Sequence, residues 1–399
     1  MPRLSPPVVI AFACLIALVT FGARAGFGLF LAPISAANGW GREVFALAIG
    51  IQNICWGLGQ PVAGALADRY GTRPVLIAGS LVYAAGLVLM GQASTPEGLH
   101  VTAGFLVGVG GAAASFGLVL AAVGRMVSEE RRSMALGLVV AASSMGQFLL
   151  VPLGQAFLSA YGYPTALAFL GALVLIVVPL SLPFGREAGA CRAATEAAQT
   201  LAQALGEAGA SRSFWLLTAG FFVCGYHVAF IQTHLPAFIV DQGVAASIGA
   251  LAIGFVGLFN VIGSFGAGFL GGRFPKHKLL SLLYLARAVV IAVYVSLPIT
   301  AASTLVFAAC MGLLWLSTVP LTSGLVALLF GPRYMATLFG IVFLSHQLGA
   351  LLGVWLGGRV FDLTGSYTGV WWGGVGLALV AALLHWPIEE RPVARLRPA

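Results

Sequence analysis

The chain has 399 residues, of which 60% are hydrophobic and 8% are charged. A soluble domain carries about 25% charged residues, so this composition excludes a soluble globular protein. It also excludes a disordered chain, because disordered chains are polar and rich in charge. The 53 glycines and 26 phenylalanines are typical of helices that pack inside a bilayer. We therefore expect an all-α membrane protein.

Hydrophobic runs along the chain predict twelve transmembrane helices. A helix needs roughly 17–25 mostly apolar residues to cross a bilayer. Runs of this kind, separated by charges and by glycine and proline clusters, cover approximately residues 8–34, 44–67, 75–93, 99–127, 133–160, 164–185, 213–240, 246–271, 279–299, 302–329, 335–360 and 366–387. Several runs exceed the required length, which predicts tilt or extension beyond the hydrocarbon.

The positive charges indicate how these helices are oriented, because short cytoplasmic loops carry an excess of lysine and arginine. One side of the predicted bundle has only Arg42 and Arg359 in its loops, and Arg24 and Arg287 lie inside spans. The other basic residues share the opposite side: Arg3, Arg69, Arg73, Arg125, Arg131, Arg132, Arg186, Arg192, Arg212, Arg273, Lys276, Lys278, Arg333, Arg391, Arg395 and Arg397. This asymmetry predicts cytoplasmic termini and explains the net charge of +8 without a nucleic acid partner.

One long polar break divides the chain into two similar parts. Residues 186–212 are rich in charge and glutamine, and the segment 193–208 within them is compatible with a surface helix. We expect an N-terminal six-helix bundle over 1–185, a cytoplasmic linker over 186–212 and a C-terminal six-helix bundle over 213–399. Paired bundles of six helices are the architecture of major facilitator transporters.

The loop after the second predicted helix supports this architecture. It reads Gly-Ala-Leu-Ala-Asp-Arg-Tyr-Gly-Thr-Arg-Pro over residues 64–74, and residues 268–273 form a degenerate echo in the second half. The loop resembles the Gly-x-x-x-Asp-Arg-x-Gly-x-Arg signature of the major facilitator superfamily. The resemblance implies a gate formed by Asp68, Arg69, Gly71 and Arg73, with the Asp68 carboxylate facing the positive N-terminal end of helix 11.

Two further helices resemble the monocarboxylate-porter branch of this superfamily, which includes the oxalate–formate antiporters. Helix 5 opens with Arg-Arg-Ser-Met-Ala-Leu-Gly-Leu over residues 131–138 and continues through Gly146 to Gln155. Helix 11 runs from Gly340 through the glycines at 353, 357 and 358 to Asp362, Gly365 and Tyr367. The resemblance implies a transporter of small organic anions.

Polar side chains inside the spans are the candidate substrate site, since such groups are costly in hydrocarbon and usually functional. The helical rise of 1.5 Å per residue places most of them near mid-depth, where substrates of such transporters bind. Gln52, Asn53 and Gln147 are equally consistent with helix–helix hydrogen bonds, Trp315 is equally consistent with packing, and Arg287 fits a structural role better. The candidates are Arg24, Gln52, Asn53, Gln147, His227, Asn260, Ser264, Trp315, His346 and Gln347.

The candidate site departs from the porters that it resembles. In those porters helix 8 carries an arginine that binds the carboxylate, and in some an acidic residue precedes it by four positions. Here Ser264 and Asn260 take these two places, and His346 takes the place of a helix 11 lysine of the oxalate–formate branch. The departure argues against simple lactate- or oxalate-type binding, and Arg24 is our candidate for a displaced cation.

Histidine is the expected proton-coupling group. All 12 acidic residues lie in predicted loops or at helix ends, so a proton relay through deep carboxylates is not expected. Histidine titrates near neutral pH, and a bound anion would favour its charged form. Proton and anion binding then reinforce each other, as symport requires. We assign this role to His346 or His227.

These observations predict a secondary active transporter of a small organic anion such as a carboxylate, coupled to protons. The alternative is an exporter of amphipathic or hydrophobic compounds, which the many phenylalanines and the missing helix 8 arginine favour. An enzyme is not expected, because the sequence lacks HExxH, GxSxG and a deep carboxylate pair. A transporter-like receptor would differ in showing no counterflow.

We expect the functional unit to be a monomer in the plasma membrane, specifically a bacterial inner membrane, with a small molecule and lipid as its partners. No cofactor or metal is predicted. The five cysteines include no CxxC pair, and His227 and His234 lie seven residues apart without a third ligand.

Overall fold

The computed structural model describes residues 6–126, 129–184, 200–331 and 333–396, without the side chains of 6, 68, 116, 124–126, 129–133 and 336. Helices and short connections make up these residues, and no β-strand occurs among them. The first part of the chain contains α1 (Pro6–Ala25), η1 (Phe27–Phe30), α2 (Leu31–Asn38), α3 (Arg42–Tyr70), α4 (Thr72–Met90), α5 (Pro96–Leu99), η2 (His100–Leu106), α6 (Val107–Ala113), α7 (Phe116–Met126), α8 (Glu129–Leu175) and α9 (Val177–Leu180).

The second part is helical in the same way. It contains α10 (Leu201–Ala210), α11 (Arg212–Asp241), α12 (Ala246–Gly271), α13 (Lys276–Ser296), α14 (Ala301–Leu314), α15 (Thr318–Phe330), α16 (Met335–Thr364), α17 (Thr368–His385) and η3 (Ala394–Leu396). A capping box between Thr200 and Gln203 starts α10, which satisfies backbone groups at its N-terminus. The predicted surface helix therefore begins later than expected, and 185–199 lie outside the described residues.

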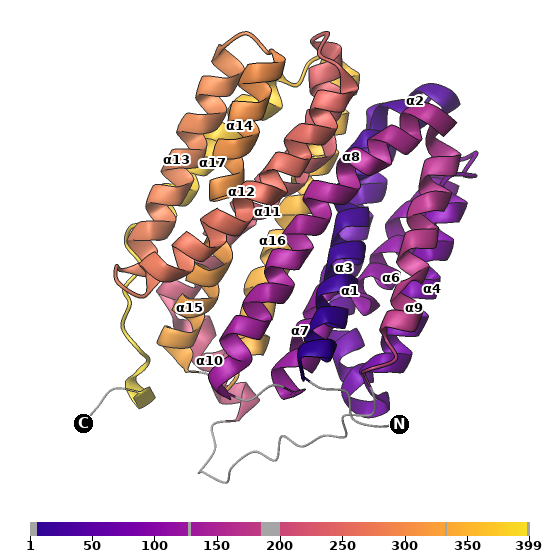
Figure 1. The fold of residues 1–399 in the computed structure, drawn as a ribbon. Helices are drawn as coiled ribbons and strands as arrows, with labels where there is room; N and C mark the ends of the chain where they lie inside the picture. The colour runs from indigo at the N-terminus through magenta and orange to yellow at the C-terminus, as the bar shows by residue number, and fades with distance from the viewer. Residues whose placement is uncertain (1–5, 127–128, 185–199, 332, 397–399) are drawn as a thin grey trace.

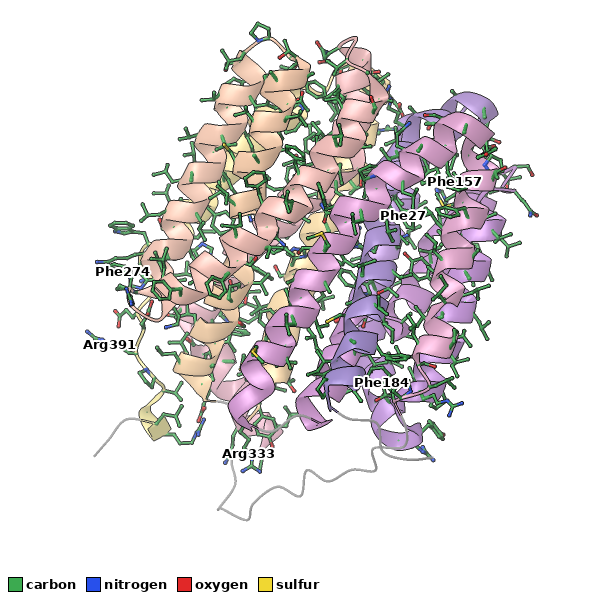
Figure 2. The ribbon with its side chains drawn as sticks, viewed as in Figure 1. Phe27, Phe157, Phe184, Phe274, Arg333 and Arg391 are labelled. Atoms are coloured by element: carbon green, nitrogen blue, oxygen red, sulfur yellow. The ribbon has the colours of Figure 1, made fainter. Side chains whose placement is uncertain are left out.

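The two parts lie side by side as roughly parallel groups of helices (Figure 1). We call α1–α9 the N-terminal bundle and α10–α17 the C-terminal bundle. Elements α3 and α8 of the first pack against α16 and α12 of the second. The start of α1, the helix α10 and the segment η3 lie at one end of the molecule, which we call the linker end; α2 lies at the opposite, far end (Figure 1). Arg333 lies at the linker end (Figure 2).

Ten helical stretches of the described residues are long and apolar enough to cross a membrane. They do not include the 29-residue helix α3, and one of them, Met134–Leu180, has 47 residues. At 1.5 Å per residue that stretch would be about 70 Å long, which is far more than one bilayer crossing. It is broken at Gly162, whose φ of 78° is not helical and is rarely adopted by other residues.

Close approach of glycines joins the bundles over the far half of their interface. A β-carbon on Gly57 of α3 would meet Gln347 of α16, and one on Gly257 of α12 would meet Ser144 of α8. By contrast, a β-carbon on Gly64 or Gly340, nearer the linker end of α3 and α16, would have no atom within 4 Å. The same is true of three glycines in the linker-end parts of α8 and α12, namely Gly137, Gly266 and Gly268.

The apolar core follows the same division. One cluster of buried side chains runs through both bundles, from Val9 in α1 to Ala378 in α17. A second cluster, which includes Phe214, Leu325 and Phe330, belongs to the C-terminal bundle alone and lies toward the linker end. In the described residues the bundles therefore share a core toward the far end and pack separately toward the linker end.

Candidate functional site

Arg24 lies near the end of α1 and is the centre of the candidate site. Its Nη2 atom donates a hydrogen bond of 2.6 Å to Asn53 Oδ1 on α3. Its guanidinium lies 4.3 Å from the ring centroid of Trp56, one turn further along α3. The side chains of Arg24 and Trp56 are partly exposed, and no ion pair among the described residues includes Arg24. A cation with this surface available can bind an anion.

Two residues of α16 connect this cation to the C-terminal bundle. Gln347 Nε2 donates to the backbone oxygen of Asn53 at 3.0 Å. The Gln347 Oε1 atom is 3.0 Å from His346 Nδ1 and is the acceptor of that contact, which leaves the proton on Nδ1. Gln347 is fully buried and His346 is 7% exposed. The structure thus brings four predicted residues, Arg24, Asn53, His346 and Gln347, into one polar network across both bundles.

Aromatic rings continue the network on the same side. Trp56 meets Phe343 of α16 edge to face, with ring centroids 5.7 Å apart. Phe343 is stacked on the His346 imidazole at 5.5 Å, with 9° between the planes. Phe221 of α11 is a second aromatic neighbour of His346, with ring centroids 5.0 Å apart. Trp56 and Phe343 are absent from the sequence prediction, although each lies three residues from a predicted polar residue on its own helix.

A second group of predicted residues joins α8 to α12. Asn260 Nδ2 donates to Ser144 Oγ at 3.1 Å, and Ser264 Oγ donates to Asn260 Oδ1 at 3.0 Å. Gln147 Nε2 donates to the backbone oxygen of Ile253 at 2.7 Å. These contacts use both polar atoms of Asn260 and the Nε2 atom of Gln147, so both side chains act as links between the bundles.

The helix predicted over 302–329 is in fact two helices, α14 and α15, separated at Trp315–Ser317. The break frees backbone groups, and buried side chains pair with them. Arg287 donates to the carbonyl oxygens of Leu314 and Trp315, and Asn260 Oδ1 accepts the N–H of Leu316 at 3.0 Å. Arg287 is 0% exposed, and its environment fits the structural role that we favour for it from the sequence.

The remaining predicted site residues are not brought to Arg24. His227 faces α17, where its Nε2 lies 2.8 Å from the backbone oxygen of Gly374. Gln52 donates to the backbone oxygen of Ala103 within the N-terminal bundle. Trp315 is buried at the helix break. Among the residues that the structure describes, no three histidine, cysteine or acidic side chains are grouped as they would be around a metal ion.

The predicted gate residues lie at the linker end, between α3 and α4. Gly71 has a φ of 93°, so the turn requires glycine there. Arg69 is exposed and stacks on Tyr70 at 5.2 Å, and Arg73 is partly buried. The side chain of Asp68 lies outside the described residues. The expected contact of its carboxylate with the N-terminal end of the eleventh predicted span, which is α16, stays a prediction.

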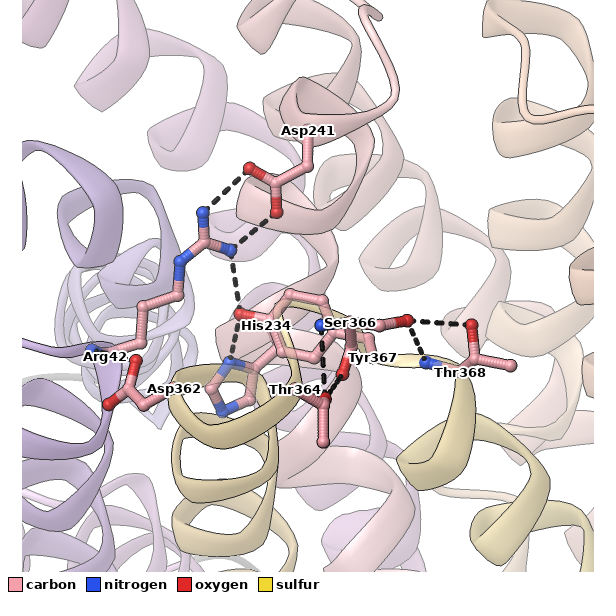
Figure 3. A network of polar contacts seen from close by, with 8 residues as sticks. All are labelled: Arg42, His234, Asp241, Asp362, Thr364, Ser366, Tyr367 and Thr368. Carbon is pink, nitrogen blue, oxygen red and sulfur yellow. Dashed lines mark hydrogen bonds and ion pairs between the residues drawn. The ribbon is translucent and has the colours of Figure 1, made fainter.

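The far end carries a polar network between the bundles that the sequence did not predict (Figure 3). The Arg42 guanidinium of α3 bonds both carboxylate oxygens of Asp241 of α11 at 2.7 Å. Arg42 Nη1 also donates to the Tyr367 hydroxyl at 3.0 Å, and the guanidinium lies 3.8 Å from the Phe361 ring centroid. We call the contacts of Arg42, Glu43, Asp241, Asp362 and Tyr367 the far-end lock.

The lock also involves the first turn of α3. The two carboxylate oxygens of Asp362, in α16, accept the backbone N–H groups of Arg42 and Glu43 at 2.9 and 2.8 Å. Glu43 in turn accepts bonds of 2.9 Å from Trp355 Nε1 and from Arg359 Nη1. A residue of one bundle thus supplies the N-terminal cap of a helix in the other.

His234 supports the lock from within the C-terminal bundle (Figure 3). Its Nε2 lies 2.8 Å from the carbonyl oxygen of Val354, which can only accept, so Nε2 carries the proton. Its Nδ1 then accepts the Tyr367 hydroxyl at 3.0 Å, and the same hydroxyl oxygen accepts Arg42. Burial raises the pKa of Tyr367, which keeps the hydroxyl a donor. These are the contacts that a neutral His234 with its proton on Nε2 makes.

Comparison with known proteins finds a matching family and several similar transporters. The family described as Major Facilitator Superfamily matches residues 13–354. Monocarboxylate transporter 13 of Rattus norvegicus is 28% identical, over 92% of this chain and 86% of its own length. Monocarboxylate transporter 11 of Homo sapiens is 29% identical, over 82% and 69%. The MFS-type transporter YcxA of Bacillus subtilis is 24% identical, over 90% and 89%.

Solved structures share the fold. A bacterial homolog of the human lysosomal transporter Spinster, in an inward-facing and unoccupied conformation, matches with a TM-score of 0.73 at 17% identity. The match covers 95% of this chain and 94% of that one. The nucleoside transporter NupG matches with a TM-score of 0.78 at 12% identity, over 95% and 99%.

Proposed function

The chain belongs to the Major Facilitator Superfamily and is a transporter rather than an enzyme, and we propose that it moves a small organic anion across the membrane by alternating access coupled to protons. The observation that carries this proposal is Arg24. It is a cation of the N-terminal bundle, linked to α16 through Asn53 and Gln347, and no carboxylate among the described residues neutralises it. An anionic substrate would supply the missing charge.

The proposal includes twelve membrane crossings with cytoplasmic termini. Helix α3 and both parts of α8, on either side of Gly162, would cross in addition to the other apolar helices. The bundles would comprise 1–185 and 213–399, joined by a cytoplasmic linker over 186–212. The excess of basic residues in the loops of the linker end supports this orientation.

The packing of the bundles supports an inward-facing state. The lock joins them at the far end, whereas glycines near the linker end of α3 and α16 have no close neighbour. The Spinster homolog of the same fold is likewise inward-facing. The substrate would reach Arg24 from the linker end, and opening of the lock would expose it to the other side.

His346 is the group we assign to proton coupling. It is buried, lies between the bundles and reaches Arg24 through Gln347 and Asn53. A second proton on the His346 ring would add positive charge beside the anion, so each ligand would raise the affinity for the other. His227 is less suited, since it faces α17.

Uptake by proteoliposomes tests the proposal. Organic anion uptake should rise as the external pH falls, Arg24→Gln should abolish it, and His346→Gln should remove its pH dependence. Trp372→Leu, at an exposed tryptophan of α17, is the control for handling of the protein. Uptake by both site variants at the wild-type rate would refute the assignment.

Export of amphipathic compounds is the second candidate function. Partly exposed aromatic side chains beside Arg24, among them Trp56 and Phe343, favour it. Resistance of cells to hydrophobic compounds, retained in Arg24→Gln and without any carboxylate uptake, would support the exporter over the anion carrier.

A further inference from the structure

The charge around Arg24 fits a substrate with one negative charge. Arg287 is the other arginine inside a predicted span, and it donates to the carbonyl oxygens of Leu314 and Trp315, while Arg42 and Arg359 belong to the contacts at the far end. The polar atoms nearest to Arg24 are satisfied, since Gln347 bonds both Asn53 and His346. A second carboxylate on the substrate would therefore meet no second permanent cation in this part of the molecule.

The same surroundings do not suit an ammonium group. The acidic side chains that the structure describes at the bundle interface are Glu43, Asp241 and Asp362, and all three belong to the far-end lock. Glu207, Glu389 and Glu390 lie with the linker-end segments. An amino acid would bring a positive charge close to Arg24 without a carboxylate to receive it, and a buried unpaired charge is costly.

Flat apolar surfaces flank the cation. The Trp56 indole faces the guanidinium at 4.3 Å, and Phe343 meets Trp56 at 5.7 Å. Phe339, one turn closer to the linker end on α16, is stacked with Phe343 at 6.4 Å. Arg24 and all three rings are partly exposed. Aromatic pairs gain free energy beyond the apolar area that they bury.

We propose that the substrate is a monocarboxylate with a flat apolar body, such as an aryl 2-oxo acid, and that Trp56 and Phe343 select it. This inference rests on the proposed function. The carboxylate binds Arg24, the body stacks against the two rings, and the absence of an amino group distinguishes the substrate from the corresponding amino acid.

Ligand binding to the purified full chain tests the inference, with dissociation constants taken from thermal unfolding over a ligand series. Four probes separate the parts of the argument: pyruvate, phenylpyruvate, phenylalanine and phenylmalonate. We expect phenylpyruvate to bind at least about tenfold more tightly than each of the others, which is about 1.4 kcal/mol. Arg24→Gln should lose phenylpyruvate and pyruvate alike.

Substitutions of Trp56 test its selective role. In Trp56→Leu the affinities for phenylpyruvate and pyruvate should converge, while Trp56→Phe, which keeps a ring, should retain most of the preference. Trp372→Leu should behave as wild type. If Trp56→Leu does not fold, Phe343→Leu tests the second ring of the pair, and unchanged preference for phenylpyruvate in that variant would overturn the selection by these rings.

The outcomes distinguish the inference from the function on which it depends. Equal affinity for pyruvate and phenylpyruvate, both lost in Arg24→Gln, would overturn ring selection and leave an anion transporter. Phenylalanine or phenylmalonate binding as tightly as phenylpyruvate would overturn the single-charge argument. Binding of no organic acid, or binding unchanged in Arg24→Gln, would refute the proposed function together with the inference.

Discussion

Breaking the ion pair between Arg42 and Asp241 should release the far end of the bundles. Both carboxylate oxygens of Asp241 are 2.7 Å from the guanidinium, and the side chains are 14% and 29% exposed. In Arg42→Gln the bond to Tyr367 is also lost, whereas Asp241→Asn removes only the ion pair. The two substitutions and their combination form a double-mutant cycle.

The magnitude follows from the burial of the pair. Exposed ion pairs contribute about 0.2–1 kcal/mol. Hydrogen bonds to charged groups contribute about 1.5–3 kcal/mol. The pair is mostly buried but lies at the end of the helices, so a coupling free energy of about 1–2 kcal/mol is expected. A change of about 1.4 kcal/mol alters the ratio of closed to open far ends tenfold.

Electron–electron distance measurements can follow this ratio. Spin labels at Ala37 and Ala245, both exposed at the far end, would report the separation of the bundles. Arg42→Gln should add a population with a longer distance. Arg391→Gln, whose partner Glu389 is in its own bundle and exposed, should leave the distances unchanged. Identical distance distributions for wild type and Arg42→Gln would show that the lock contributes no free energy to closure.

Three further changes probe the packing. Gly57→Val would place a β-carbon 2.7 Å from Gln347 Cγ and should reduce far-end closure in the same distance assay, whereas Gly64→Val, with no atom within 4 Å, should not. Arg287→Met leaves two carbonyl groups unpaired and should lower stability to thermal unfolding by about 3 kcal/mol, and Arg287→Lys by less; equal stability of all three proteins would contradict the role of Arg287 at the helix break. Acid should weaken far-end closure, because a protonated His234 presents a second N–H to the Tyr367 hydroxyl and a positive charge to Arg42. A pH dependence of closure that persists in His234→Phe would exclude this histidine as its cause.

The polar half of the candidate site was predictable and its aromatic half was not. Arg24, Asn53, His346 and Gln347 stand out because polar groups are rare in apolar spans. Trp56 carries no such signal, because aromatic residues make up 11% of the chain and most of them pack. Its place beside the cation depends on how α1 and α3 are placed relative to each other, which the local sequence does not determine.

The far-end lock was missed for a related reason. Arg42, Asp241 and Asp362 lie at the ends of predicted spans, where charged residues are ordinarily solvated. Their partners are 199 and 320 residues away along the chain, so only the tertiary structure pairs them. The break at Trp315 is similar, since it depends on contacts from the distant residues Arg287 and Asn260.

The cap that Asp362 provides has a consequence for the helix it completes. The N–H groups of Arg42 and Glu43 are satisfied only while α16 stays beside α3. When the bundles part, this turn loses its acceptor, at a cost of about 1 kcal/mol, and its end can fray into water. Hydrogen–deuterium exchange at these two amides would then report which way the protein faces, without any label attached to it.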